Sequence, residues 1–167
     1  METKKCTDSL TVKTAQILPP DTNAYGTLFG GKLMAHIDDV AAIAAIRHAR
    51  QTSVTASTDS VDFLAPVKLG DFIILESFVT FTHKTSMEVF VRVITESKNT
   101  GDKKVCATSF LTFVALDADG KPVPVPEVVP ESTQEKELYA GAELRRERRN
   151  ERRQHSLSMA KEFGKLK

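Results

Sequence analysis

The sequence predicts an α+β fold in which one long, buried helix is wrapped by a curved antiparallel sheet. Three observations lead to this class. A single strongly apolar helical segment lies early in the chain, alternating apolar and polar segments follow it, and turn residues separate those segments. The chain has 167 residues, of which 41% are hydrophobic and 27% charged. These values are typical of one soluble globular domain.

The N-terminal part contains one strand and then the helix. Residues Ser9–Leu18 alternate and are rich in Thr and Val, which indicates a strand that ends at Pro19 and Pro20. Lys32–Arg50 has apolar residues at helical spacing on one side and further apolar residues on the others. Such a helix is expected to be enclosed by the rest of the domain.

The central part reads as four strands. Their predicted bounds are Val54–Leu64, Phe72–Thr82, Ser86–Glu96 and Lys103–Leu116. We expect them to form an antiparallel meander in sequence order. A sheet that wraps one helix leaves its other face partly apolar, so we also expect another sheet or subunit to cover that face.

The character of the chain changes after this sheet. We expect one domain over residues 8–126, followed by a Pro-rich linker and a charged helical tail over residues 127–167. The tail helix is predicted from Thr133 to about Gln154. Glutamates alternate there with arginines, which favours a solvated, salt-bridged helix over a nucleic-acid clamp.

Composition excludes several classes of function. The formal net charge is +1, so the overall balance indicates no polyanionic partner. Cys6 and Cys106 are expected to be reduced thiols, the N-terminus lacks the apolar run of a signal peptide, and Val40–Ile46 is too short to span a bilayer. We therefore expect a cytoplasmic protein with no membrane or nucleic-acid partner. The four histidines have no metal-ligand spacing, and no serine-hydrolase, Walker or dinucleotide motif occurs, so neither a metal nor an organic cofactor is expected.

The most informative stretch is NAYGTLFGG, directly before the helix. Gly30 and Gly31 stand where the helix begins, and glycines there allow a ligand to approach unpaired N–H groups at the positive end of the helix dipole. Such a site can hold a thioester carbonyl and stabilise an oxyanion. A tight structural turn explains the glycines equally well. Asn23 has the same ambiguity, since turn and cap positions are its commonest use.

Two adjacent aspartates follow within the helix. Asp38 and Asp39 differ by about 100° around the helix axis, so we expect them to have different roles. One can be a surface partner for a Lys or Arg. The other can act on a bound carbonyl, as general base toward water or as nucleophile, or it can be a structurally paired carboxylate.

These segments resemble a known family. NAYGTLFGGKLMAHIDDVAAIAAIRHA, VTASTDSVDFLAPVKLGD and KTSMEV are similar to the acyl-CoA thioesterase branch of the hotdog superfamily. The resemblance implies a hotdog fold and hydrolysis of fatty acyl-CoA to the free acid and CoA without a cofactor. It further implies pairing of two copies, commonly assembled into a trimer of dimers.

The resemblance also assigns roles to residues. It implies that Asn23 and Asp38 are catalytic and come from different domains of the pair, and that the helix start at Gly30 and Gly31 binds the carbonyl. It gives Asp39 no role. The resemblance places the segment Lys84, Thr85 and Ser86 near the CoA phosphates, although the residues alone favour an ordinary hairpin edge.

Three alternative functions follow from the same residues. Other hotdog branches are acyl-CoA dehydratases or isomerases, but these place His or Glu where Asn23 and Asp38 stand. An acyl-CoA-binding sensor would use the same fold without hydrolysis. Nucleic-acid binding through the arginine-rich tail is disfavoured by its interleaved glutamates.

Overall fold

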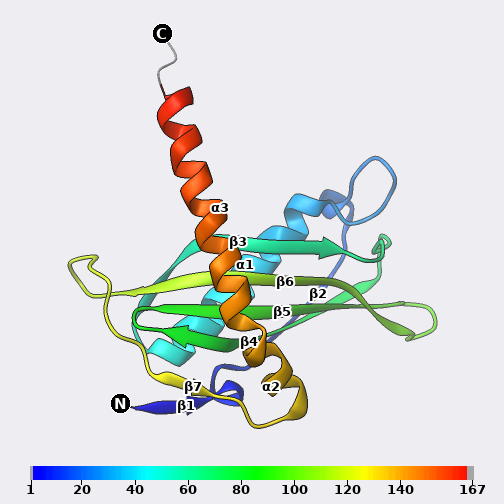
Figure 1. Ribbon diagram of the computed structural model, residues 1–167. Coiled ribbons are helices and arrows are strands. Elements are labelled where there is room, and N and C mark those ends of the chain that lie inside the picture. The colour runs from blue at the N-terminus through cyan, green and yellow to red at the C-terminus, as the bar shows by residue number, and fades with distance from the viewer. Residues whose placement is uncertain (1, 165–167) are drawn as a thin grey trace.

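The computed structural model describes residues 2–164 and shows a curved sheet wrapped around one helix (Figure 1). Its elements are β1 (Thr3–Lys5), β2 (Thr11–Gln16), α1 (Gly30–Ala49), β3 (Thr52–Phe63), β4 (Phe72–His83), β5 (Ser86–Glu96), β6 (Lys103–Leu116), β7 (Glu127–Val129), α2 (Thr133–Ala140) and α3 (Ala142–Phe163). The predicted α+β class and the wrapped central helix are confirmed.

Helix α1 is the centre of the core. Its buried positions are those that the helical spacing predicts, namely Leu33, Ile37, Val40, Ala41, Ala44 and His48, together with Ala45 and Ala49. The helix begins two residues earlier than predicted, at Gly30. It ends at Ala49, and the left-handed conformation of the C-cap residue, Arg50, lets the N–H of Arg50 donate to the carbonyl of Ile46 at 2.8 Å.

The main sheet has the order β2-β4-β5-β6-β3 and is antiparallel throughout. The meander is confirmed for β4, β5 and β6. The prediction that the first of the four strands lies beside the second is wrong, because β3 pairs with β6 at the far edge. Alternation identifies a strand but not its neighbour. Here the connection between β3 and β4 returns past the start of α1, where the N–H of Leu28 donates to the carbonyl of Val67 at 2.8 Å.

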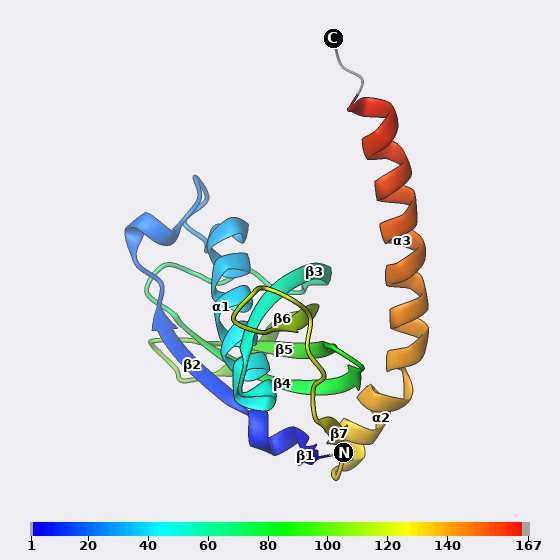
Figure 2. The same cartoon turned by 90° about the vertical axis from the view of Figure 1, so that its left-hand side faces the viewer.

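The face of the sheet away from α1 is covered partly by the chain itself, and the expectation that another sheet or subunit also covers this face stays a prediction. Helices α2 and α3 lie along it, as Figure 2 shows from the side. The segment predicted as a linker contains β7, which pairs in parallel with β1. Ser132 then caps α2, accepting from the N–H of Glu135.

Burial lowers the pKa of His48 below its ordinary value of 6.5. The ring is fully buried, and its Nε2–H donates to the carbonyl of Pro126 at 2.9 Å. Its Nδ1 has no hydrogen-bond partner among the described residues. The folded state therefore holds His48 neutral at a pH where the unfolded chain already binds a proton.

We predict that His48 makes the protein less stable in mild acid. Since the unfolded state binds more protons, the free energy of unfolding should fall as pH drops below 6.5, by up to about 1.4 kcal/mol per pH unit. Urea titrations at fixed protein concentration and at pH 7.5, 6.5 and 5.5 measure this loss. His48→Gln should reduce it, while the exposed control His155→Gln should leave it unchanged. An identical pH dependence in wild type and His48→Gln would contradict the assignment.

Candidate active site

The N-terminus of α1 offers two backbone donors. The N-cap residue, Phe29, makes no side-chain cap, and its carbonyl accepts from the N–H groups of Lys32 and Leu33. Within residues 2–164, the N–H groups of Gly30 and Gly31 have no acceptor. They lie at the positive end of a 20-residue helix, which is the arrangement that favours a carbonyl oxygen or an anion.

The two glycines differ in how closely they are surrounded. A Cβ atom on Gly31 would lie 2.6 Å from the ring of Phe29, so a side chain there forces that ring to move. A Cβ on Gly30 would lie 3.5 Å from the ring of Phe63, an ordinary contact. Beside them is an open apolar cavity of about 400 Å³, lined by Leu28, Gly30, Leu33, Phe63, Leu64, Ala65, Pro66 and Val67. The free amides thus border a surface that suits an acyl chain.

Asn23 organises the loop before the helix. Its Oδ1 accepts from the N–H of Tyr25 at 3.0 Å and from the N–H of Thr27 at 3.3 Å, and its side chain also contacts the Thr27 hydroxyl. Gly26 between them has a φ of +71°. Within one chain, Asn23 therefore does the work of a turn residue. No contact between Asn23 and Asp38 occurs in the single chain.

Asp38 is half-buried on α1 and is held by strand β3. The hydroxyl of Thr55 donates to its Oδ1 at 2.7 Å, while Oδ2 has no partner among the described residues. Thr55 is not among the residues that the sequence predicted for the site. In the sequence Thr55 is only a polar residue within a predicted strand. It can be assigned to the site only once the strand is known to place this residue against α1. A carboxylate with one oxygen fixed and the other free is suited to accept a proton from water.

The neighbouring Asp39 has the surface role that one of the two aspartates is expected to have. It is exposed and forms an ion pair with Lys13 of β2. Adjacent positions on the helix thus place one carboxylate against β3 and the other against β2, at opposite edges of the sheet.

Lys84, Thr85 and Ser86 form the turn between β4 and β5, far from Gly30. Lys84 has a φ of 44°, and the carbonyls of Lys84 and Thr85 accept from Val125 and Ala115. Ser86 pairs with Val114 of β6, whereas Phe63, beside the glycine cavity, pairs with Ala107. Seven residues along a strand correspond to roughly 23 Å. One chain therefore does not bring this turn to the glycine cavity.

Residues 2–164 contain no group of three or more His, Cys, Asp or Glu side chains arranged to hold a metal ion. None of the helices in that range has the length and hydropathy needed to cross a lipid bilayer.

Comparison with known proteins shows the family. Residues 25–101 match the family described as Thioesterase superfamily. A Bacillus subtilis protein named as an acyl-CoA thioester hydrolase is 54% identical over 98% of this chain and 95% of its own length. The cytosolic acyl coenzyme A thioester hydrolase of Rattus norvegicus is 37% identical over 72% of this chain, which corresponds to 32% of the rat protein.

Solved structures agree with this result. The acyl-CoA hydrolase of Staphylococcus aureus, solved with butyryl coenzyme A, coenzyme A and coenzyme A disulfide, superposes with a TM-score of 0.93 at 44% identity, covering 98% of this chain and 99% of that one. Variants of that enzyme with one Asn, one Asp or one Thr replaced by Ala have also been solved. A hexameric acyl-CoA thioesterase superposes with a TM-score of 0.89 at 49% identity, over 91% and 97% of the two chains. The chain accordingly has the hotdog fold and belongs to the acyl-CoA thioester hydrolase family of the thioesterase superfamily.

Proposed function

We propose that this enzyme, an acyl-CoA thioester hydrolase, acts on fatty acyl-CoA in a site assembled from two copies of the chain. The observation that carries this proposal is the pair of unpaired N–H groups at Gly30 and Gly31 beside an apolar cavity. The cavity takes the acyl chain, and the amides hold the thioester carbonyl and stabilise the oxyanion that forms on attack.

A second copy is required because the amides and the carboxylate of one chain are too far apart. Asp38 lies eight residues beyond Gly30, which is about 12 Å along a helix. A general base must act within hydrogen-bond reach of the water that attacks the carbonyl. We therefore propose that the amides and Asn23 of one copy meet Asp38 of another.

Residue spacing supports the roles of three side chains. In the Staphylococcus aureus hydrolase the replaced Asn and Asp are fifteen residues apart, and the replaced Asp and Thr are seventeen apart. Asn23, Asp38 and Thr55 have the same two spacings here. We assign Asp38 as the catalytic carboxylate, Asn23 as the residue that orients water or carbonyl, and Thr55 as the positioning residue that holds Asp38.

The chemistry needs only these groups. The Asp38 carboxylate removes a proton from water as the oxygen attacks the thioester carbon, and the amides hold the resulting oxyanion. The C–S bond then breaks, the CoA sulfur leaves with a proton, and the free acid is released. Direct attack by Asp38 to form an acyl anhydride, which water then hydrolyses, uses the same groups. Neither route calls for a metal or an organic cofactor.

The remaining assignments follow from the family. We propose that Lys84, Thr85 and Ser86 contact the phosphates of CoA, and that the protein is a dimer assembled further into a trimer of dimers, as hexameric relatives support. We propose a cytoplasmic location, because the rat relative is named cytosolic and because Cys6 and Cys106 are both free and buried.

Hydrolysis is tested with a series of acyl-CoA substrates from butyryl to palmitoyl, with free thiol as the readout. We expect saturable thiol release that a metal chelator does not reduce. A sensor would bind acyl-CoA without releasing thiol. A dehydratase would change the absorbance of a hydroxyacyl-CoA substrate without releasing thiol. Either result would overturn the proposed function.

A further inference from the structure

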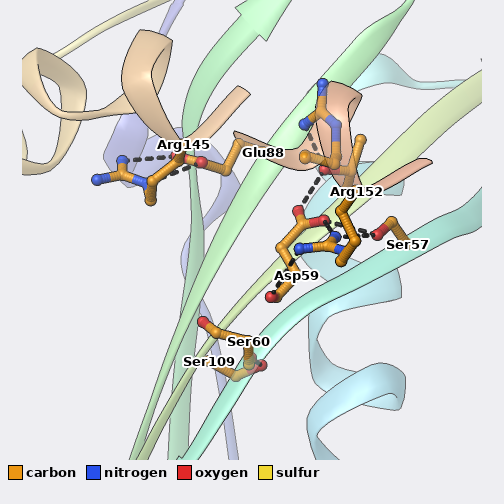
Figure 3. A network of polar contacts seen from close by, with 9 residues as sticks. Ser57, Asp59, Ser60, Glu88, Ser109, Arg145 and Arg152 are labelled. Carbon is orange, nitrogen blue, oxygen red and sulfur yellow. Dashed lines mark hydrogen bonds and ion pairs between the residues drawn. The ribbon is translucent and has the colours of Figure 1, made fainter. Parts of the chain in front are cut away.

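Helix α3 crosses the outer face of the sheet, strand by strand. Figure 3 shows the first and last of its contacts: Arg145 with Glu88 of β5 at 2.8 Å, and Arg152 with Asp59 of β3 at 2.7 Å. Between them, Arg149 donates to the hydroxyl of Thr112 in β6 at 2.6 Å. The helix thus reaches the edge strand β3 at Arg152.

Beyond Arg152 no hydrogen bond or ion pair joins the helix to its own sheet within the described chain. Four residues of this part, Arg153, Ser156, Leu157 and Ala160, line a cavity of about 610 Å³ together with Ala56, Ser57, Thr112 and Val114 of the sheet. We call residues Arg153–Phe163 the arm. It contains eleven residues, which is about 16 Å of helix, and both ribbon views show it projecting past β3 (Figures 1 and 2). Every residue of the arm is exposed, including Leu157, Met159 and Phe163, the last of which is 62% exposed. Large apolar side chains on a helix that projects into solvent indicate a surface that binds a partner.

The strand beneath the start of the arm has a free edge. β3 is 12 residues long and pairs only on its β6 side in the described chain. An unpaired edge of this length readily takes up another strand. A strand of a second copy added there would extend the sheet, and adjacent strands lie about 4.8 Å apart. An arm of 16 Å would then cover about three strands of that second copy.

The charges of the two surfaces are complementary. The outer face of β3 carries the exposed Asp62, which pairs with Thr108 on the same face as Arg92 and Glu88, and Asp59, which already pairs with Arg152 of its own α3. The arm carries the cations Arg153 and Lys161 and one carboxylate, Glu162, beside its apolar side chains. In a two-fold pair, the same contact is made twice.

The arm is also retained in similar proteins. The Bacillus subtilis relative aligns over 98% of this chain, and the Staphylococcus aureus hydrolase superposes over 98% of it. Each comparison leaves out only about 2% of the chain, which is less than the share that the arm and the residues after it occupy. Both comparisons therefore include most or all of the arm.

We infer that two copies pair edge to edge through their β3 strands, and that the arm of each copy lies across the outer face of the other copy. The inference rests on the self-association proposed above for the active site. It concerns a different surface, because Asp38 and Thr55 lie on the face of the sheet toward α1. The arm therefore fastens the pair of subunits from outside and takes no part in the chemistry.

Photo-cross-linking tests the contact directly. The full chain carries Phe163→p-benzoylphenylalanine and is assembled from a mixture of isotopically heavy and light copies, so that cross-links between subunits contain one peptide of each kind. We expect them to join the arm to residues 57–63 or 103–113 of the second copy. The matched control, Glu147→p-benzoylphenylalanine, lies on α3 above its own sheet and should give no such link.

Other outcomes overturn the inference without deciding the enzymatic function, which thiol release measures separately. The inference is overturned if the cross-links lie only within one copy, or if they join the arm to α1 or to residues 22–29 of a second copy. It is also overturned if an oligomeric sample, as judged by light scattering, gives no cross-links. A monomeric sample would overturn it as well. A second measurement is the dissociation constant of the pair, which Leu157→Gln, Met159→Gln and Phe163→Gln together should raise at least tenfold. No rise would also contradict the arm contact.

Discussion

Replacing Asp38 by asparagine is expected to lower kcat for thioester hydrolysis by a factor of about 10²–10⁴, the usual contribution of a general base. The amide keeps the shape and can still accept from Thr55, so the fold should survive while proton removal from water is lost. Initial rates of thiol release over a range of acyl-CoA concentrations measure kcat and KM. Circular dichroism and light scattering confirm that folding and assembly are unchanged.

The matched control lies one residue away. Asp39→Asn removes a carboxylate of the same helix, but one that forms an exposed ion pair with Lys13. Exposed ion pairs contribute about 0–1 kcal/mol to the free energy of unfolding. We therefore expect the kcat of Asp39→Asn to stay within a few-fold of wild type. Equal losses for Asp38→Asn and Asp39→Asn would show that the effect is general to the helix, and would remove the basis for assigning catalysis to Asp38.

The same variant tests whether the site is shared between subunits. Asp38→Asn and Asn23→Ala should each be nearly inactive alone. When the two are unfolded and refolded together, half of the dimers should be mixed, and each mixed dimer contains one intact site and one doubly altered site. About a quarter of the wild-type activity should therefore return. Absence of recovery, with exchange verified by tagged subunits, would place Asn23 and Asp38 of one chain in one site.

Replacing Arg145 by methionine is expected to cost about 3–5 kcal/mol of unfolding free energy, because it leaves a buried charge without its partner. Only 4% of the Glu88 side chain is exposed, and Arg145 donates to both of its carboxylate oxygens, at 2.8 and 2.9 Å. The guanidinium also lies 4.2 Å from the ring centroid of Phe110. Urea denaturation followed by circular dichroism measures the loss.

Two further variants separate the buried charge from the rest of the helix. Arg152→Met breaks the pair with Asp59, but 46% of the Arg152 side chain is exposed, so a loss of about 1 kcal/mol or less is expected. Adding Glu88→Gln to Arg145→Met removes the stranded charge and should recover part of the stability. If Arg145→Met and Arg152→Met cost the same, burial of Glu88 does not decide the energetics of this contact.

Most secondary structure could be predicted from the sequence, for a local reason. Each element of the central domain has a clear hydrophobic period, so α1 and all five strands of the main sheet lie within two residues of their predicted bounds. The strand Thr11–Gln16 is shorter than predicted by two residues at each end. The short strands β1 and β7 were missed, because three residues carry too little pattern and the two strands stabilise each other only across the chain.

The candidate site also contains some residues that the sequence indicates and one, Thr55, that it does not. Asp38 stands out in the sequence because a carboxylate is unusual in an apolar helix, and the glycines stand out because they stand at the helix start. The role of Asn23 came from the resemblance to the family. The role of Thr55 does not stand out, because a hydroxyl in a strand has meaning only once the strand is known to face Asp38 at 2.7 Å. The local pattern also left the two aspartates equivalent. In the structure, Asp39 reaches Lys13 of β2 while Asp38 reaches β3.

The sequence by itself determined that this protein has one enclosed helix, a set of antiparallel strands, and a glycine-rich helix start followed by a carboxylate. Those features depend on period, residue type and spacing along the chain. Only the tertiary structure decided that β3 lies at the edge beside β6, that α3 covers the outer face through Arg145, and that Thr55 of β3 holds Asp38. Strand order and helix docking depend on contacts between residues far apart in the chain, and no local pattern encodes those contacts.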